Sequence, residues 1–278
     1  MQTTVFFGGS AYVLPIIEAI RKDFDLKLVI TTDSKPTDPV PHYCIEQHIP
    51  YLSVTKLDAS VIAEIKAIHA SFAVLAYFGL IVPQTLLDLF PKGIINIHPS
   101  LLPTYRGSTP VQSTLLAGDT KTGVTIIKLD SQVDHGPILG QETVDITPGE
   151  TTPHLHKRLF EKGASLLAEV LPPYLEEKLI PREQNHVYAS YTQQLTRQSG
   201  YFDVQKQPDK ETLDRMIRAY APWPGVWCRT SINGAEKIIK FLPDRTLQVE
   251  GKKPMTYKDF LNGYPDEEVI RGLIQKLS

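Results

Sequence analysis

Two polar stretches of the chain, each next to an apolar run, contain side chains that could take part in acid–base chemistry. Asn96 and His98 lie two residues apart at the end of an apolar run, so that in a strand both side chains point to the same face. Asp134 lies in the polar stretch 130–136, which follows the apolar run 124–129. Ligands of open parallel sheets bind beyond the carboxyl ends of the strands, and we expect Asp134 to meet His98 there.

An amide, an imidazole and a carboxylate on one face suit the transfer of an acyl group to an amine. The imidazole of His98 can take a proton from the attacking amine. The amide of Asn96 can stabilise the oxyanion that forms from the carbonyl, and the carboxylate of Asp134 can orient the imidazole and support its charged form. The sequence has no GxSxG motif, which favours direct attack by the amine over a covalent enzyme intermediate. These residue types are also common in turns and caps, so a purely structural role stays open.

The elements that must position these side chains follow from the alternation of apolar runs and helical spacing. Strand-like runs are found at residues 4–7, 26–30, 51–52, 72–77, 94–98 and 124–129. Segments with helical spacing lie between several of them, which predicts an α/β fold, a parallel sheet with helices on both faces. A long helix opens at Thr152, with Pro153 in its first turn, and we expect it to stop near Pro172.

The pattern of the sequence changes after about residue 180. Residues 181–207 are polar and irregular, which is typical of a linker. Residues 208–278 contain a helical run at 213–220, short strand-like runs at 226–228 and 238–241, and a second helix around 259–261. We therefore predict a catalytic domain over 1–180, a linker over 181–207 and a smaller, partly β domain over 208–278.

The composition limits the classes of function that are open to the chain. The formal net charge is −2, so the chain lacks the overall positive field with which many proteins hold nucleic acid. The two cysteines are far apart and form no CxxC pattern, which fits a reducing, cytoplasmic setting. No apolar run approaches the length of a membrane span, and no export signal is apparent. No cluster of metal ligands is evident, so we expect no bound metal. We also expect the protein to be a monomer.

The segment 96–107, NIHPSLLPTYRG, resembles the signature of the folate-dependent formyltransferases. The segment 118–136, GDTKTGVTIIKLDSQVDHG, is similar to the family's second motif, and FFGGSAYVLP near the start extends the similarity over nearly the whole first domain. The resemblance implies a Rossmann-like formyltransferase domain that takes its formyl group from 10-formyltetrahydrofolate, with Asn96, His98 and Asp134 as the catalytic residues. It also implies donor-binding residues at strand ends and in loops: Tyr77, Gly79, Leu80, Ser100, Leu102, Pro103 and Asp130.

Three further segments, 191–196, 217–225 and 251–255, resemble the methionyl-tRNA enzymes of this family. This resemblance implies methionyl-tRNA as the acceptor and a shortened OB-like β domain at the C-terminal end. It implies that the turn with Gly9 and Ser10 lies near the acceptor. Arg106, Lys252 and Lys253 are further candidates for contacts with acceptor phosphates, although Arg106 could equally pair with a carboxylate and the two lysines could be solvated surface. Two departures concern the acceptor: residues 32–39, where those enzymes carry a basic loop, are short and not basic, and the C-terminal domain is short.

Other functions stay open beside the predicted one. A nucleotide-sugar N-formyltransferase would use the same three side chains on an amino sugar. A catalytically silent folate-binding or RNA-binding module is a second alternative, which the intact trio argues against because a binding module needs none of the three. A 10-formyltetrahydrofolate hydrolase is a third, but we would expect its second domain to precede the catalytic one.

Overall fold

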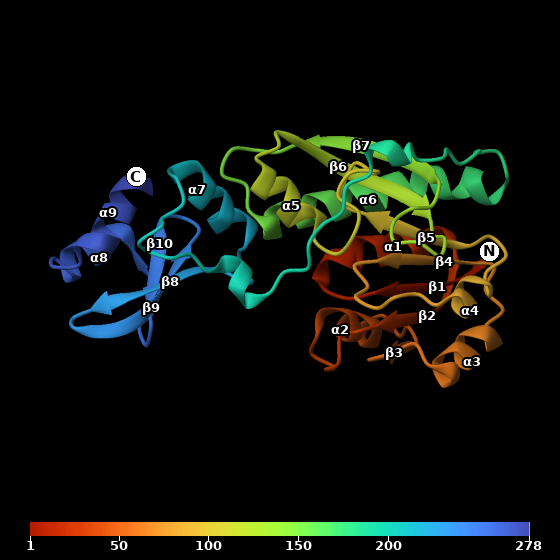
Figure 1. Cartoon of the computed structure of the whole chain (residues 1–278). Helices are drawn as coiled ribbons and strands as arrows, with labels where there is room; N and C mark the ends of the chain where they lie inside the picture. Colours follow the sequence, from red (N-terminus) through yellow and green to blue (C-terminus); the bar gives the residue numbers. More distant parts are fainter. Residues whose placement is uncertain (278) are drawn as a thin grey trace. The chain divides into compact units, whose positions relative to one another are not determined.

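The computed structural model describes residues 1–277, which divide into two compact units (Figure 1). The first unit comprises Met1–Pro110, Lys121–Asp145 and His156–Thr192. The second comprises Val111–Thr120, Ile146–Leu155 and the chain from Gln193 on. The segment 181–207, for which the sequence predicts a linker, is therefore shared, and its first part, up to Thr192, belongs to the first unit.

The first unit is built on a seven-stranded sheet with the strand order β3-β2-β1-β4-β5-β6-β7. Its strands are β1 (Thr3–Gly8), β2 (Asp25–Thr31), β3 (Tyr51–Ser53), β4 (Phe72–Ala76), β5 (Ile94–His98), β6 (Lys121–Lys128) and β7 (Ile138–Asp145). The strands β1 to β5 pair in parallel, as predicted. However, β6 runs antiparallel to β5, and β7 runs antiparallel to β6. The predicted parallel sheet is therefore confirmed for β1 to β5, and the two strands at this edge, β6 and β7, are antiparallel.

The direction of β6 follows from the connection that precedes it. A parallel neighbour of β5 would need a crossover that packs on the sheet, usually as a helix. The connection contains α5 (Pro110–Ala117), but residues Val111–Thr120 belong to the second unit. Because no helix of the first unit carries the chain back across the sheet, β6 begins at the edge where β5 ends.

Helices cover both faces of this sheet. The helices of the first unit are η1 (Ala11–Val13), α1 (Leu14–Asp23), α2 (Pro39–Glu46), α3 (Ala59–Ala67), α4 (Gln84–Leu87), α6 (Thr152–Leu175) from His156 on, and η2 (His186–Tyr188). One core cluster joins α1, α2 and α6 to the face with Ile95 and Ile97 of β5. The other joins α3 and α4 to the face with Ile94. Because side chains alternate along a strand, Asn96 and His98 share the face of Ile94.

The helix α6 is longer than the sequence predicts, since it continues past Pro172 to Leu175. Proline is most costly in a helix interior, where its ring and its missing N–H disturb the preceding turn. Pro172 and Pro173 lie in the last turn, so few helical hydrogen bonds are at stake. The carbonyl of Pro172 still accepts a hydrogen bond from the N–H of Glu176 at 3.0 Å.

The second unit contains an antiparallel sheet with the order β11-β10-β9-β8. Its strands are β8 (Val226–Ile232), β9 (Ala235–Leu242), β10 (Thr246–Val249) and β11 (Met255–Thr256), and its helices include η3 (Arg197–Gly200), α7 (Lys210–Ala219), α8 (Tyr257–Gly263) and α9 (Glu268–Leu277). Asn233 and Gly234, both at positive φ, connect β8 to β9, as in a two-residue hairpin. The predicted C-terminal β domain is confirmed. Its described strands form an open four-stranded sheet.

Candidate active site

The strand β5 places Asn96 and His98 on one face of the sheet, and both residues are buried, with 6% and 4% of their surface exposed. The Nε2 atom of His98 lies 2.9 Å from the carbonyl oxygen of Tyr105. A carbonyl oxygen only accepts hydrogen bonds, so this nitrogen carries a proton. In neutral His98, the lone pair that can take a further proton is therefore on Nδ1.

Asp134 reaches this face from the loop between β6 and β7. One carboxylate oxygen, Oδ1, accepts a hydrogen bond from Nδ2 of Asn96 at 3.2 Å. The other, Oδ2, lies 3.5 Å from Nδ1 of His98. The predicted trio is thus brought together, but not for the predicted reason. Because β6 is antiparallel, its carboxyl end lies beside the start of β5, and the loop has to turn back to carry Asp134 to Asn96 and His98.

The returning loop is held by groups that are far away in the sequence. Asp134 has a positive φ of 47°, a conformation that Asp adopts more readily than most residues. The N–H of Gly107 donates to its Oδ2 at 2.8 Å. The Nε2 atom of Gln184 donates to the carbonyl oxygens of Asp134 at 2.8 Å and Gly136 at 2.7 Å. Both the carboxylate and the backbone that carries it are therefore fixed.

This arrangement has the groups that amine acylation needs. The Nδ2 atom of Asn96 uses one hydrogen on Asp134 and has a second hydrogen to offer to a developing oxyanion. Nδ1 of His98 can take a proton, and the carboxylate of Asp134 then faces the positive charge. The site is largely screened from solvent, which strengthens these electrostatic interactions.

A cavity of about 440 Å³ opens on the side of the sheet to which Ile94 belongs. Its lining combines apolar side chains with polar ones: Gln84, Leu87, Asp88, Phe90, Gly93, Ile94, Lys128, Leu129, Asp130 and Ser131. Asp130, for which the sequence predicts donor binding, thus lines a cavity. Its carboxylate is tied to the loop, since Oδ2 lies 2.6 Å from Nδ1 of His135 and Oδ1 accepts the N–H of Gln132 at 2.9 Å.

The other residues predicted to bind the donor differ in how available they are. Leu102 is buried against Ile127 and Ile138, and its peptide bond to Pro103 is cis. Ser100 is fully buried, and its hydroxyl donates to the carbonyl of Thr104 at 2.7 Å. Its side chain therefore holds the turn and has no surface to offer to a ligand.

The segment from Tyr77 to Leu80 divides between the two faces of the sheet. The ring of Tyr77 packs against His156 and Phe160 of α6, at centroid distances of 5.5 and 5.9 Å, which is the face opposite to Asn96. Leu80 packs on the core cluster of the Asn96 face, and Gly79 is exposed with open space beside it. Of the three predicted donor-binding residues in this segment, Leu80 has its side chain on the same face as the trio, together with its neighbour Phe78.

The first glycine-rich turn, with Gly9 and Ser10, is already occupied by a carboxylate. The N–H of Ser10 points at both oxygens of Asp33, at 3.3 and 3.2 Å. The N–H of Val40, in the first turn of α2, also points at this carboxylate, at 3.4 Å. A phosphate at this turn would meet the negative charge of Asp33, which argues against Gly9 and Ser10 as acceptor contacts.

Arg106 lies in the interior of the first unit, with 1% of its surface exposed. Its NH2 nitrogen lies 2.7 Å from Oε1 of Gln184 and 2.8 Å from Nδ1 of His186. Its NH1 donates to the hydroxyl of Tyr191 at 3.2 Å. A guanidinium buried in this way has no surface to offer to an acceptor phosphate, and we assign Arg106 no acceptor contact.

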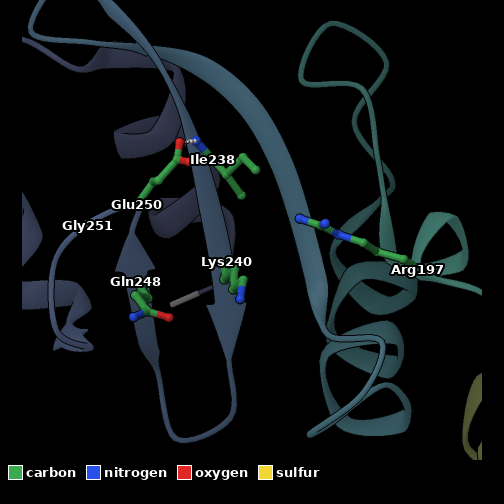
Figure 2. Close-up of a pocket in the computed structure, with 6 residues that line it drawn as sticks. All are labelled: Arg197, Ile238, Lys240, Gln248, Glu250 and Gly251. Atoms are coloured by element: carbon green, nitrogen blue, oxygen red, sulfur yellow. Dashed lines mark hydrogen bonds between the residues drawn. The ribbon is translucent and has the colours of Figure 1, made fainter.

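Lys252 and Lys253 are exposed in the turn that follows β10 in the second unit. Near this turn lies a cavity of about 200 Å³, lined by Arg197, Ile238, Lys240, Gln248, Glu250 and Gly251 (Figure 2). Figure 2 shows Ile238 and Lys240 on one strand and Gln248 on its neighbour, with Arg197 on the other side of the cavity. The guanidinium of Arg197 lies 5.4 Å from the ring centroid of Trp227, a cation–π contact that holds it in place.

Neither cysteine is a candidate nucleophile. Burial raises the pKa of the Cys44 thiol to about 11 and that of the Cys228 thiol to about 12. Both are therefore protonated at neutral pH, and the thiol is a poor nucleophile.

Among the described residues there is no group of three or more His, Cys, Asp or Glu side chains that could hold a metal ion. No described helix is long and apolar enough to cross a membrane.

Sequence reasoning missed the groups that hold the trio in place. Gln184 lies 50 residues from the Asp134 carbonyl that it binds, and neither local pattern nor spacing signals such a contact. The carbonyl of Tyr105 and the N–H of Gly107 belong to the backbone, which carries no residue-type signal at all. The positive φ values of Tyr105 and Asp134, 61° and 47°, are likewise set by tertiary contacts.

Comparison with known proteins adds to this geometry. The model of the formyl transferase family matches residues 24–171. The chain is 38% identical to the methionyl-tRNA formyltransferase of Roseiflexus sp. (strain RS-1), over 88% of this chain and 78% of the relative. It is 32% identical to the methionyl-tRNA formyltransferase of Cereibacter sphaeroides, over 96% of this chain and 98% of the relative.

Among solved structures, a sugar N-formyltransferase from a Shewanella species superimposes with a TM-score of 0.67. The match covers 88% of this chain and 98% of that one at 17% identity, so it shows the fold alone. The family match and the two relatives carry more weight, because they cover most of the sequence at higher identity. The chain belongs to the formyl transferase family.

Proposed function

We propose that this protein transfers the formyl group of 10-formyltetrahydrofolate to the amino group of methionyl-tRNA. The observation that carries the proposal is the contact of Asp134 with both Asn96 and His98 on one buried face. The relatives named methionyl-tRNA formyltransferase support the choice of donor and acceptor. Fold alone would not decide the acceptor, because one fold serves many substrates.

In the proposed reaction the amine nitrogen attacks the formyl carbon directly. A new C–N bond forms, and the carbonyl oxygen becomes an oxyanion that accepts the second hydrogen of the Asn96 amide. The amine loses a proton to Nδ1 of His98, and the carboxylate of Asp134 stabilises the imidazolium. The oxyanion then returns to a carbonyl, the bond from the formyl carbon to N10 of the folate breaks, and the His98 imidazolium gives its proton to N10. The products are formylmethionyl-tRNA and tetrahydrofolate.

The donor is proposed to bind along the face that carries Ile94, in and beside the 440 Å³ cavity. An apolar wall with Leu87, Phe90 and Leu129 suits a flat heterocycle, and the polar groups of the loop that begins at Asp130 suit its ring nitrogens. This position would leave the formyl group next to Asn96, two residues further along β5.

The acceptor is proposed to be held mainly by the second unit. Arg197, Lys240, Lys252 and Lys253 supply exposed positive charge there. Such charges bind phosphates without reading the nucleotide sequence. Residues 32–39 hold a single lysine, Lys35, together with Asp33 and Asp38. This part of the chain therefore offers little positive charge to a phosphate.

An acceptor screen tests this proposal. The purified protein is given 10-formyltetrahydrofolate together with methionyl-tRNA or with an amino-sugar nucleotide, and formylated product is measured. We expect formylation of methionyl-tRNA with a kcat/KM at least about 100-fold above that for the amino sugar, a gap of about 2.7 kcal/mol. Rapid formylation of the amino sugar and none of methionyl-tRNA would move the protein to the sugar-modifying class.

A further inference from the structure

The segment 181–192, here called the strap, runs along the loops that form the site. It pairs with the start of β7 through a bridge between Ile138 and Arg182, and with the loop after β5 through a bridge between Arg106 and Tyr191. Ser190 adds three hydrogen bonds to the same loop: its N–H donates to Pro103 O at 3.2 Å, its carbonyl accepts the N–H of Arg106 at 2.8 Å, and its hydroxyl oxygen accepts the N–H of Tyr105 at 2.9 Å. The strap therefore joins the two loops that meet at the trio.

Gln184 is the strap residue that reaches the Asp134 loop. Its side chain is 5% exposed. Its Oε1 must face Arg106, because a guanidinium only donates, and its Nε2 must face the carbonyls of Asp134 and Gly136, because carbonyls only accept. The amide has one possible orientation, and both of its hydrogens are used on the loop.

The charge of Arg106 strengthens this arrangement. A hydrogen bond from a guanidinium is stronger than one between neutral groups, and donation to Oε1 polarises the amide so that its N–H groups become better donors. The bond of 2.7 Å from Arg106 to Gln184 and the bonds of 2.8 and 2.7 Å from Gln184 to the loop thus form one connected chain. The chain ends on the backbone of the residue whose carboxylate touches Asn96 and His98.

We propose that Gln184, oriented by Arg106, is a positioning residue that sets the placement of the Asp134 carboxylate. Asp134 depends on such a support because it lies on a returning loop, whereas Asn96 and His98 are fixed by β5. This inference rests on the proposed function, since it requires Asp134 to act in formyl transfer. It gives the strap a role in the rate of the reaction.

Two substitutions separate positioning from folding. Gln184→Glu keeps an acceptor for Arg106 but cannot donate to the carbonyls of Asp134 and Gly136. Gln184→Met keeps the approximate volume and removes both interactions. We expect each to lower kcat at least about tenfold, with the KM values of donor and acceptor changed less than about threefold, because a small misplacement of a catalytic group affects the reaction step. Glu183→Gln, an exposed change next to it in the strap, is the control and should keep kcat within twofold.

A double-mutant cycle supplies the decisive readout. If Gln184 acts through Asp134, adding Gln184→Met to Asp134→Asn should lower kcat less than about threefold further. Equal losses in both backgrounds would overturn the proposal, as would a Gln184→Glu protein with kcat within twofold of wild type. A Gln184→Glu protein that unfolds more than about 10 °C below wild type would show a structural role instead. The assays use whichever acceptor the wild-type protein formylates, so failure of methionyl-tRNA as acceptor is seen separately in the wild type.

Discussion

The polar groups of the two units are arranged in opposite ways. In the first unit, Asn96 and His98 are 6% and 4% exposed and have defined partners at 2.9 to 3.5 Å. In the second unit, Arg197 and Lys240 are exposed at the edge of a cavity of about 200 Å³. Buried groups with fixed partners suit a reaction, which needs one geometry. Exposed cations suit the capture of a large anion, because this attraction does not need one fixed geometry. This difference predicts that substitutions in the site of the first unit lower turnover, whereas substitutions of the cations in the second unit lower the affinity for the acceptor.

The largest effect is expected in the buried trio. His98→Ala and Asn96→Ala should each lower kcat by roughly 100-fold or more, the scale of one acid–base or oxyanion group. KM should change little, because both side chains are proposed to act on charges that develop only in the transition state. Steady-state kinetics of the purified variants give both constants. His42→Ala and Asn262→Ala, at exposed positions, are the controls, and near-normal turnover of either trio variant would remove that residue from the mechanism.

A smaller and opposite effect is expected in the second unit. Arg197→Glu combined with Lys240→Glu should raise the KM for methionyl-tRNA by about tenfold and leave kcat nearly unchanged, because repulsion of phosphates weakens binding before and during the reaction alike. Lys22→Glu combined with Lys66→Glu, in the first unit, changes the net charge equally and serves as the control. A drop in kcat with unchanged KM would show that the two units do not divide their tasks in this way.

The salt dependence of acceptor binding should be shallow. Each phosphate neutralised on a duplex contributes roughly −0.9 to the slope of log affinity against log salt. With a net charge of −2 and few exposed cations near the second-unit cavity, we expect a slope on the order of −2 to −4. A titration of methionyl-tRNA binding between low and moderate salt measures it. A slope steeper than about −6 would reveal a basic surface outside Arg197, Lys240, Lys252 and Lys253.

The smallest effect is expected from thiol modification. Burial raises the pKa of Cys44 to about 11 and that of Cys228 to about 12. At pH 8, below both values, roughly one Cys44 thiol in a thousand is ionised, and fewer at Cys228. Iodoacetamide at this pH should therefore leave the activity of the native protein unchanged over an hour, while the unfolded protein is alkylated at both positions, as mass spectrometry would show. Rapid inactivation of the native protein would mean that a thiol is reactive after all.

The sequence predicts those parts of the site that local rules control. Asn96 and His98 share a face because a strand alternates its side chains, and this prediction depends on nothing outside β5. The meeting of Asp134 with His98 was expected from a parallel sheet, but β6 is antiparallel, and the contact depends on a loop that turns back. The predicted contact is present, but the parallel pairing of β5 and β6 from which it was predicted is not.

Long-range contacts mark the limit of what the sequence can predict. Nothing in the residue pattern around Arg106 or Gln184 indicates that the two are buried together, with their nearest partners about 50 to 85 residues away in the chain. Cutting the chain near Lys178, at the end of the predicted catalytic domain, would remove the strap with Gln184. The roles of the two units are therefore better separated by substitutions in the full chain than by truncation.

A single-turnover experiment with a labelled formyl group tests the central claim most directly. The protein, in excess over methionyl-tRNA, is mixed with 10-formyltetrahydrofolate labelled in the formyl carbon, quenched at intervals and separated into protein, folate and tRNA. The label should pass from the folate to the amino nitrogen of methionine without appearing on the protein. The rate should fall by roughly 100-fold in Asn96→Ala, the scale expected for loss of an oxyanion donor. Label that accumulates on the protein, or that never reaches methionine, would contradict direct transfer to methionyl-tRNA.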